Sequence, residues 1–265
     1  MTKVIFNIFL FAAALITPVI PAVAQGIVRK AAGPDAAAIQ GAVAQYRNDL
    51  GTLNPNVAQT FPSGRREINW DGVPDGFASP NTMPANFFNA NSPRGAVFST
   101  ACESATFRIS AKLGNPTNTP VRFGEIDPSY TDTFKAFSPQ RLFTVVGGNG
   151  EPCSTLSVNF FAAGTNIPAE TTGFGVVFSD VDIPGHVRFV SYDRFGNVLE
   201  PGVITAERSN DGFSFIGVSY PEAKIARVDI ESGKTGLLYG ILDSKPGKDV
   251  VAMDDFLYGE PQPIQ

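Results

Sequence analysis

The feature that most constrains the fold is the texture of the chain after residue 53, where short runs of strand-forming residues alternate with glycine, proline, asparagine and aspartate. The 265 residues include 26 glycines and 21 prolines, and helical periodicity is almost absent from this part. Strands are predicted at residues 67–70, 96–100, 106–112, 155–162, 174–181, 186–193, 203–207, 212–220, 225–231 and 250–258. Many short strands of this kind predict an all-β fold, a two-sheet antiparallel sandwich of the jelly-roll type.

One helix is predicted, and it precedes the strands. Four apolar residues recur at the spacing of one helical face: Ile39, Val43, Tyr46 and Leu50. Pro34 and Asp35 mark its start, and Gly51 marks its end. We therefore expect a helical N-terminal arm and connector over residues 25–64, a β-sandwich domain over 65–260 and a short tail over 261–265.

The N-terminus has the composition of an export signal. Lys3 precedes an apolar stretch over residues 4–20, and Pro18 and Pro21 break any helix before the small residues of Ala22-Val23-Ala24. This pattern predicts a signal peptide over residues 1–24 and a secreted or periplasmic product. No later segment is apolar for long enough to span a bilayer, so we expect no membrane anchor after cleavage.

Two cysteines, Cys102 and Cys153, lie in the part expected to be exported. An oxidising compartment favours a disulfide bond between them, and two separate buried thiols are the alternative. The formal net charge of −5 and the lack of any basic run exclude nucleic acid as an expected partner.

Residues for catalysis are scarce. His186 is the single histidine, no Gly-x-Ser-x-Gly motif accompanies it, and we interpret it as a surface imidazole. Glu125 and Asp127 resemble the start of the carboxylate-rich strand of jelly-roll glucanases, but Tyr130 occupies the third acidic position. A non-catalytic module is therefore favoured. The alternative is a secreted carbohydrate-active hydrolase with carboxylates drawn from distant segments: Glu67, Asp71, Glu125 and Asp127.

Paired aspartates indicate a different chemistry. Asp180 and Asp182 are two residues apart, so strand geometry would place both on one face, whereas the adjacent Asp254 and Asp255 would point to opposite faces. Calcium binds six to eight oxygens from carboxylates and carbonyls. These four aspartates are the predicted calcium ligands, with solvated surface carboxylates as the alternative.

Trp70, the only tryptophan, lies beside Asp71 and close to Asp75 in a segment rich in glycine and proline. The indole either fills the sandwich core or provides a stacking platform for a sugar ring. In the second case, Trp70, Asp71 and Asp75 form the predicted ligand-binding site for a glycan or another cell-surface polymer.

Several segments resemble a group of exported bacterial β-sandwich proteins that have no assigned activity. They are residues 64–73 (GRREINWDGV), 138–143 (SPQRLF), 172–178 (TGFGVVF) and 251–256 (VAMDDF). Residues 215–218 and 225–228, with the closing strand, are also similar to domains of proteins that carry a C-terminal Pro-Glu-Pro sorting signal. This chain departs from those proteins because it ends at Gln265 without such a signal. The resemblance implies an exported sandwich and brings no activity.

Overall fold

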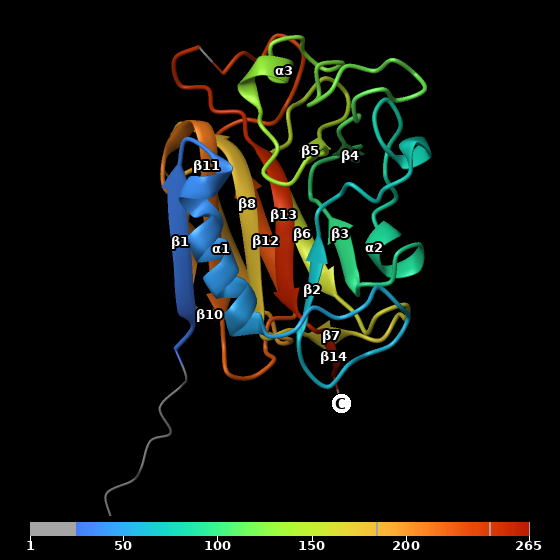
Figure 1. The fold of residues 1–265 in the computed structure, drawn as a ribbon, viewed down its shortest axis with the longest axis vertical. Helices are drawn as coiled ribbons and strands as arrows, with labels where there is room; N and C mark the ends of the chain where they lie inside the picture. The colour runs from blue at the N-terminus through green and yellow to red at the C-terminus, as the bar shows by residue number, and fades with distance from the viewer. Residues whose placement is uncertain (1–24, 184, 244, 265) are drawn as a thin grey trace, which may run out of the picture.

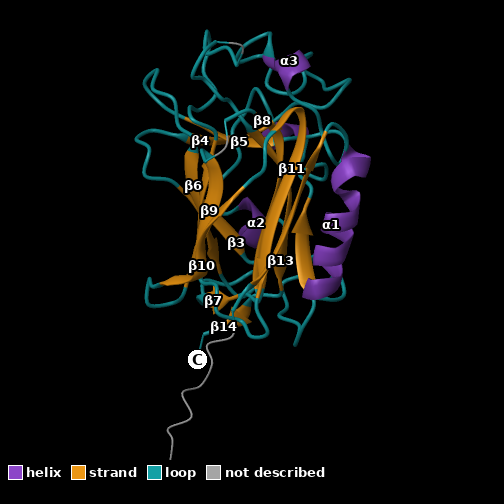
Figure 2. Cartoon of the chain, turned by 90° about the vertical axis from the view of Figure 1, so that its left-hand side faces the viewer, coloured by secondary structure: helices purple, strands orange, loops and turns teal. Residues whose placement is uncertain are grey.

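The computed structural model describes residues 25–183, 185–243 and 245–264, so the predicted signal peptide lies outside the described residues. Two antiparallel sheets pack face to face, with a helix on the outer side of the larger one (Figures 1 and 2). The larger sheet has the order β1 (Ile27–Gly33), β11 (Ser209–Ser219), β8 (Gly173–Val181), β13 (Ala252–Gly259), β5 (Phe143–Val146) and β4 (Thr106–Ile109), and β2 (Arg65–Ile68) also pairs with β13. The predicted all-β sandwich is confirmed.

The second sheet has five strands, in the order β10 (Val198–Thr205), β9 (Val187–Tyr192), β12 (Arg227–Ser232), β6 (Thr155–Phe160) and β3 (Ala96–Ser99). Short elements complete the fold: the strand pair β7 (Ala169–Glu170) and β14 (Gln262–Pro263), the 3-10 turn η1 (Asp75–Phe77), and the helices α2 (Phe87–Ala90) and α3 (Tyr130–Thr133). Among the described residues, no helix is long and apolar enough to cross a membrane.

Helix α1 (Ala36–Leu50) covers the outer face of the larger sheet, as its apolar spacing requires. The four residues of the predicted face are all buried, Asp35 caps the helix by accepting from the Ala38 N–H, and Gly51 follows its last turn. The Tyr46 hydroxyl donates to the Val218 carbonyl at 2.8 Å. The ring can lie flat on the sheet because Gly175 and Gly217 have no side chains; a Cβ atom there would lie 2.6 and 2.9 Å from it.

The structure differs from the sequence prediction at the N-terminal arm. Residues 27–33 form β1, which pairs with β11 over its whole length. The arm is therefore partly built into the sandwich and is not helical throughout. The periodicity argument missed this strand because its apolar residues do not alternate with polar ones: Ile27 and Val28 are adjacent, and so are Ala31 and Ala32.

Strand β13 carries a second difference, at Asp254 and Asp255. Its pairing with β8 shifts register between Met253 and Phe256, which marks a β-bulge. The bulge interrupts the alternation, so the expectation that the two aspartates point to opposite faces is wrong. The Ser138 hydroxyl lies 3.0 Å from an Asp254 oxygen and 2.6 Å from an Asp255 oxygen.

Candidate ligand and metal sites

Trp70 belongs to the core of the sandwich. The residue is 1% exposed, its indole stacks on Phe143 with ring centroids 4.2 Å apart, and its N–H donates to the Asp254 carbonyl at 2.9 Å. No sugar ring can reach it. Of the two readings of Trp70, the core reading holds, and its inclusion in a ligand-binding site is corrected by this burial.

Asp71 and Asp75 hold the segment 138–142 in place. Asp71 accepts backbone N–H bonds from Gln140 and Arg141, and Asp75 pairs with the Arg141 guanidinium and, at 3.3 Å, with Lys112. Arg141 is itself almost fully buried, and it also donates to the Ser110 carbonyl. The two aspartates thus have internal partners, and the structure does not bring them together with an exposed aromatic ring.

The other predicted aspartates divide into two separate groups. Asp180, Asp182 and Asp243 form a cluster in which one carboxylate oxygen from each lies within 4.8 Å of the others. Asp180 is the next-to-last residue of β8 and Asp182 directly follows the strand, whereas Asp243 comes from the long loop between β12 and β13, near α3 (Figure 1). Asp249 of the same loop joins them by accepting from the Asp182 and Ile183 N–H groups at 3.1 and 3.2 Å.

Backbone geometry at the end of β8 places these groups together. Asp180 adopts a left-handed φ of 68°, beside an irregularity in the pairing of β8 with β11. One oxygen of Asp180 accepts from the Asp211 N–H at 2.7 Å, and one of Asp243 accepts from the Val250 N–H at 3.1 Å. Asp182 Oδ1 is buried and has no hydrogen-bond partner. A buried acceptor without a donor is costly, and a cation would satisfy it.

The pKa values of Asp180, Asp243 and Asp249 in this cluster are raised, mainly because the groups are buried. Burial, followed by the neighbouring carboxylates, raises the pKa of Asp180 to about 7. Burial, followed by the neighbouring carboxylates of Asp182 and Asp180, raises the pKa of Asp243 to about 8. Burial also raises the pKa of Asp249. Within the described part of the chain, no basic side chain forms an ion pair with these four aspartates, so the cluster could bind a metal ion.

Sequence reasoning found only half of this cluster. Asp180 and Asp182 were identified from their spacing, but Asp243 and Asp249 lie some 60 residues further along, in a loop whose path the sequence does not reveal. The one signal was the concentration of acidic and basic residues between Asp243 and Asp249, which reads equally well as a solvated loop.

Asp254 and Asp255 have their own partners. Asp254 accepts from the Phe137 N–H at 2.6 Å, and Asp255 lies 3.2 Å from the Arg47 guanidinium of α1. Burial and the neighbouring Asp255 hold the pKa of Asp254 well above its ordinary value. Among the described residues, no third carboxylate lies close enough to Asp254 and Asp255 to share a metal ion with them. We therefore assign no metal to this pair.

Three of the four carboxylates of the alternative hydrolase reading have partners of their own, Asp71 among them, whereas both oxygens of Glu125 are buried without a hydrogen-bond partner among the described residues. Glu67 pairs with Arg47 at 2.9 Å and with Arg65 at 2.6 Å. Asp127 caps the turn before α3 by accepting from the Ser129 N–H and hydroxyl, and it also accepts from the Gly240 N–H. Hydrogen bonds from these three groups lower the pKa of Asp127, which keeps it ionised. A general acid needs the opposite shift.

The outer face of the five-stranded sheet carries regularly spaced polar side chains. Inward residues of β9, β12 and β6 are buried and alternate with partly exposed ones. Strand register aligns the outward residues in three rows across the sheet. The first row is Thr205, Arg188, Glu231 and Thr155; the second is Val203, Val190, Asp229, Ser157 and Ser99; the third is Val198, Tyr192, Arg227, Asn159 and Val97.

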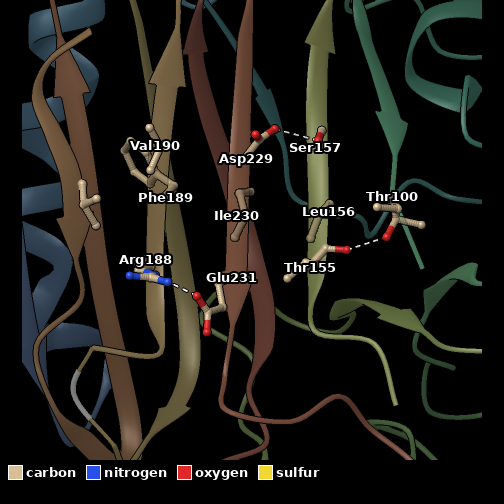
Figure 3. A pocket seen from close by; sticks show the side chains of 12 residues that line it. Thr100, Thr155, Leu156, Ser157, Arg188, Phe189, Val190, Asp229, Ile230 and Glu231 are labelled. Atoms are coloured by element: carbon tan, nitrogen blue, oxygen red, sulfur yellow. Dashed lines mark hydrogen bonds and ion pairs between the residues drawn. The ribbon is translucent and has the colours of Figure 1, made fainter. Parts of the chain in front are cut away.

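Charges on this face pair with one another. Arg188 contacts Glu231 at 2.7 Å (Figure 3). Arg227 contacts Asp229 at 3.0 Å. Asp229 also accepts from the Ser157 hydroxyl at 2.7 Å. His186, the single histidine, lies 3.3 Å from Glu231 with its side chain 40% exposed, in agreement with a surface imidazole.

A groove of about 400 Å³ runs over the first two rows. Its floor includes Val190, Ser157 and Asp229, and Thr100 forms one wall (Figure 3). Ala101 also lines the groove. That wall is fixed by the Thr100 hydroxyl, which donates to the Thr155 carbonyl at 2.7 Å, and by the disulfide two residues further on. The predicted Cys102–Cys153 bond is thus confirmed, and it borders the groove.

Comparison of the chain with protein-family models gave no match, and comparison with curated proteins gave none either.

Proposed function

We propose that this protein is an exported, non-catalytic module that binds carbohydrate on the outer face of its five-stranded sheet and is stabilised by calcium. The observation that carries the proposal is the groove over that face, where hydroxyl, carboxylate and guanidinium groups stand in register on a rigid sheet. Sugar hydroxyls both donate and accept hydrogen bonds, so they suit a surface that offers both kinds of partner.

The position of the groove on strands supports a pre-organised binding site. A site built on strands keeps its side chains in place better than one on loops. The floor rests on a core of buried residues, and the wall at Thr100 is cross-linked through Cys102 to Cys153. A pre-organised groove of this kind loses little conformational entropy when a ligand binds.

Calcium is the second part of the proposal. Asp180, Asp182 and Asp243 would hold the ion, and the unsatisfied Asp182 Oδ1 is the observation that favours it. Carboxylates are the oxygen donors that calcium prefers, and the charge of the ion would offset their mutual repulsion. The cluster joins the end of β8 to the loop before β13, so an ion there would stiffen one end of the sandwich.

The test is a panel of immobilised polysaccharides, incubated with the protein in calcium and in chelator, beside a panel of glycoside substrates. Retention on at least one polysaccharide, with no product released, is the expected result. The variant Ser157→Val should weaken retention because it removes a hydroxyl from the floor. Gln40→Ala, on the exposed side of α1 and on the opposite sheet, is the matched control and should bind as the unaltered protein does. Hydrolysis of any substrate, or no retention on any polysaccharide, would overturn the proposal.

A further inference from the structure

The charge pairing on the groove face defines which carbohydrates it can take. The four charged side chains of the three rows are two arginines and two acids, and each arginine contacts an acid of the same face: Arg188 with Glu231 and Arg227 with Asp229. The charges of these rows therefore cancel, and the face offers no net charge to an ionic ligand.

We infer that the groove binds neutral glycans, with the paired charges acting as fixed hydrogen-bond donors and acceptors for sugar hydroxyls. This inference rests on the proposed function and deepens it. A neutral hydroxyl can add to a paired arginine or carboxylate without separating the pair. An anionic sugar gains no net attraction from a face whose four charges cancel, and Glu231 and Asp229 repel it.

The third row adds an apolar contact. Tyr192 stands next to Val190 along β9, and the Arg227 guanidinium lies 4.3 Å from the centre of its ring. The same guanidinium also contacts Asp229, so ring and cation form a stack beside the groove. A stacked aromatic ring with a polar tip suits the apolar face of a pyranose, and it requires no charge on the ligand.

Titration calorimetry with neutral and anionic oligosaccharides of equal length tests the inference, in low salt and in about 0.5 M NaCl, where exposed charges are largely screened. We expect neutral ligands to bind with an affinity that salt leaves unchanged. Tyr192→Ala should weaken binding about tenfold, the change expected for one lost aromatic contact. Thermal melting of the variant shows whether it has kept the fold.

A gain of function makes the test sharper. Glu231→Gln leaves Arg188 without its acid, so the variant should acquire salt-sensitive binding to anionic oligosaccharides that the unaltered protein lacks. Asp132→Asn makes the same change in net charge in α3, away from the groove, and should acquire none. If the unaltered protein binds anionic ligands alone, with affinity that falls in salt, the inference is overturned and the proposed function stands. Failure to bind either class overturns both.

Discussion

Arg66 and Glu260 form an ion pair that water does not reach: their side chains are 0% and 1% exposed, and Arg66 Nη2 lies 2.8 Å from Glu260 Oε1. Arg66 also donates to the Gln59 carbonyl, and Glu260 accepts from Asn54 and from the Phe61 N–H. The pair therefore joins the connector that follows α1 to the end of β13.

Removal of one partner of this pair should destabilise the protein strongly. Arg66→Met leaves the Glu260 carboxylate buried without a cation, and we expect the free energy of unfolding to fall by about 3–5 kcal/mol. Arg29→Met is the control, because Arg29 pairs with Asp49 at a solvent-exposed site and should contribute little. Urea denaturation measures both. Equal midpoints for Arg66→Met and the unaltered protein would show that the buried pair adds no stability.

Two adjacent arginines beside Glu67 indicate a charged cluster at residues 65–67, but the sequence does not show which acids the arginines pair with. Adjacent Arg65 and Arg66 alternate across β2, so they face opposite sides and reach different acids. Arg65 meets Glu67 on the helix side, while Arg66 meets Glu260, which lies 194 residues away in the chain. Pairings over such separations depend on the register of β2 with β13, and composition carries no information on register.

The helix and the sandwich were more accessible to prediction than the sites. Four apolar residues on one face, with a capping aspartate and a terminal glycine, are local signals, and the structure confirms each of them. The bulge at Asp254 and the left-handed φ of Asp180 depend on strand pairing and tertiary contacts, and no local pattern of residue types specifies them. Strand alternation therefore did not predict the directions of the aspartate side chains at these two candidate sites.

The disulfide should contribute substantially to stability. The bond between Cys102 and Cys153 closes a loop with a sequence separation of 51, for which the chain-entropy model gives about 4 kcal/mol. Titration of the denatured, unreduced protein should find no free thiol. The double variant Cys102→Ser, Cys153→Ser should lose stability by about that amount, and each single variant should expose one thiol. Two free thiols per unaltered chain would contradict the pairing.

The acidic cluster should make stability depend on pH in a direction set by its raised pKa values. The pKa of Asp180 is about 7 and that of Asp243 is about 8, whereas an aspartate in the unfolded chain has a pKa of 3.8. Between about pH 4 and pH 8 the folded protein therefore binds more protons than the unfolded chain does. Their contribution to stability is complete below about pH 4 and is lost as pH rises through about 7–8. Without calcium, thermal midpoints at pH 8 should lie below those at pH 5 in a buffer of constant ionic strength.

Calcium should reverse that trend, because it replaces the protons. A hundredfold excess over the dissociation constant stabilises by about 2.7 kcal/mol, and the effect should be larger at pH 8 than at pH 5, where protons compete. Asp243→Asn should reduce the difference between calcium and EDTA, whereas Asp255→Asn, outside the cluster, should leave it intact. The opposite pattern would place the ion at Asp255, and superimposable melts in calcium and EDTA would leave the cluster without an ion.

Arg47 should fasten α1 to the sandwich through charge. It contacts Glu67 at 2.9 Å and Asp255 at 3.2 Å with its side chain only 23% exposed, so it is the cation shared by two carboxylates. Burial raises the pKa of Glu67, but hydrogen bonds from Arg47 and Arg65 outweigh that effect and lower it overall. A carboxyl group whose pKa is lowered by folding stabilises the protein at any pH above the pKa that it has in the unfolded chain. This stability is lost as the pH falls through the pKa that the group has in the folded protein. Arg47→Met should therefore cost about 1–3 kcal/mol at pH 7, between the values for exposed and buried pairs, and less near pH 3.

Hydrogen exchange of the α1 amides provides the readout specific to this role, because loss of the anchor should speed exchange over Ala36–Leu50 more than in β9 or β12. Arg47→Lys, which keeps the charge and loses the two-pronged contact, should restore part of the stability lost in Arg47→Met. Gln45→Met is the matched control, because it also replaces a polar side chain of α1 by methionine but removes only a long hydrogen bond of 3.4 Å to Asp49. A cost that stays constant from pH 3 to pH 7 would mean that Arg47 acts through packing of its aliphatic stem, and the carboxylates would then contribute nothing to the attachment of the helix.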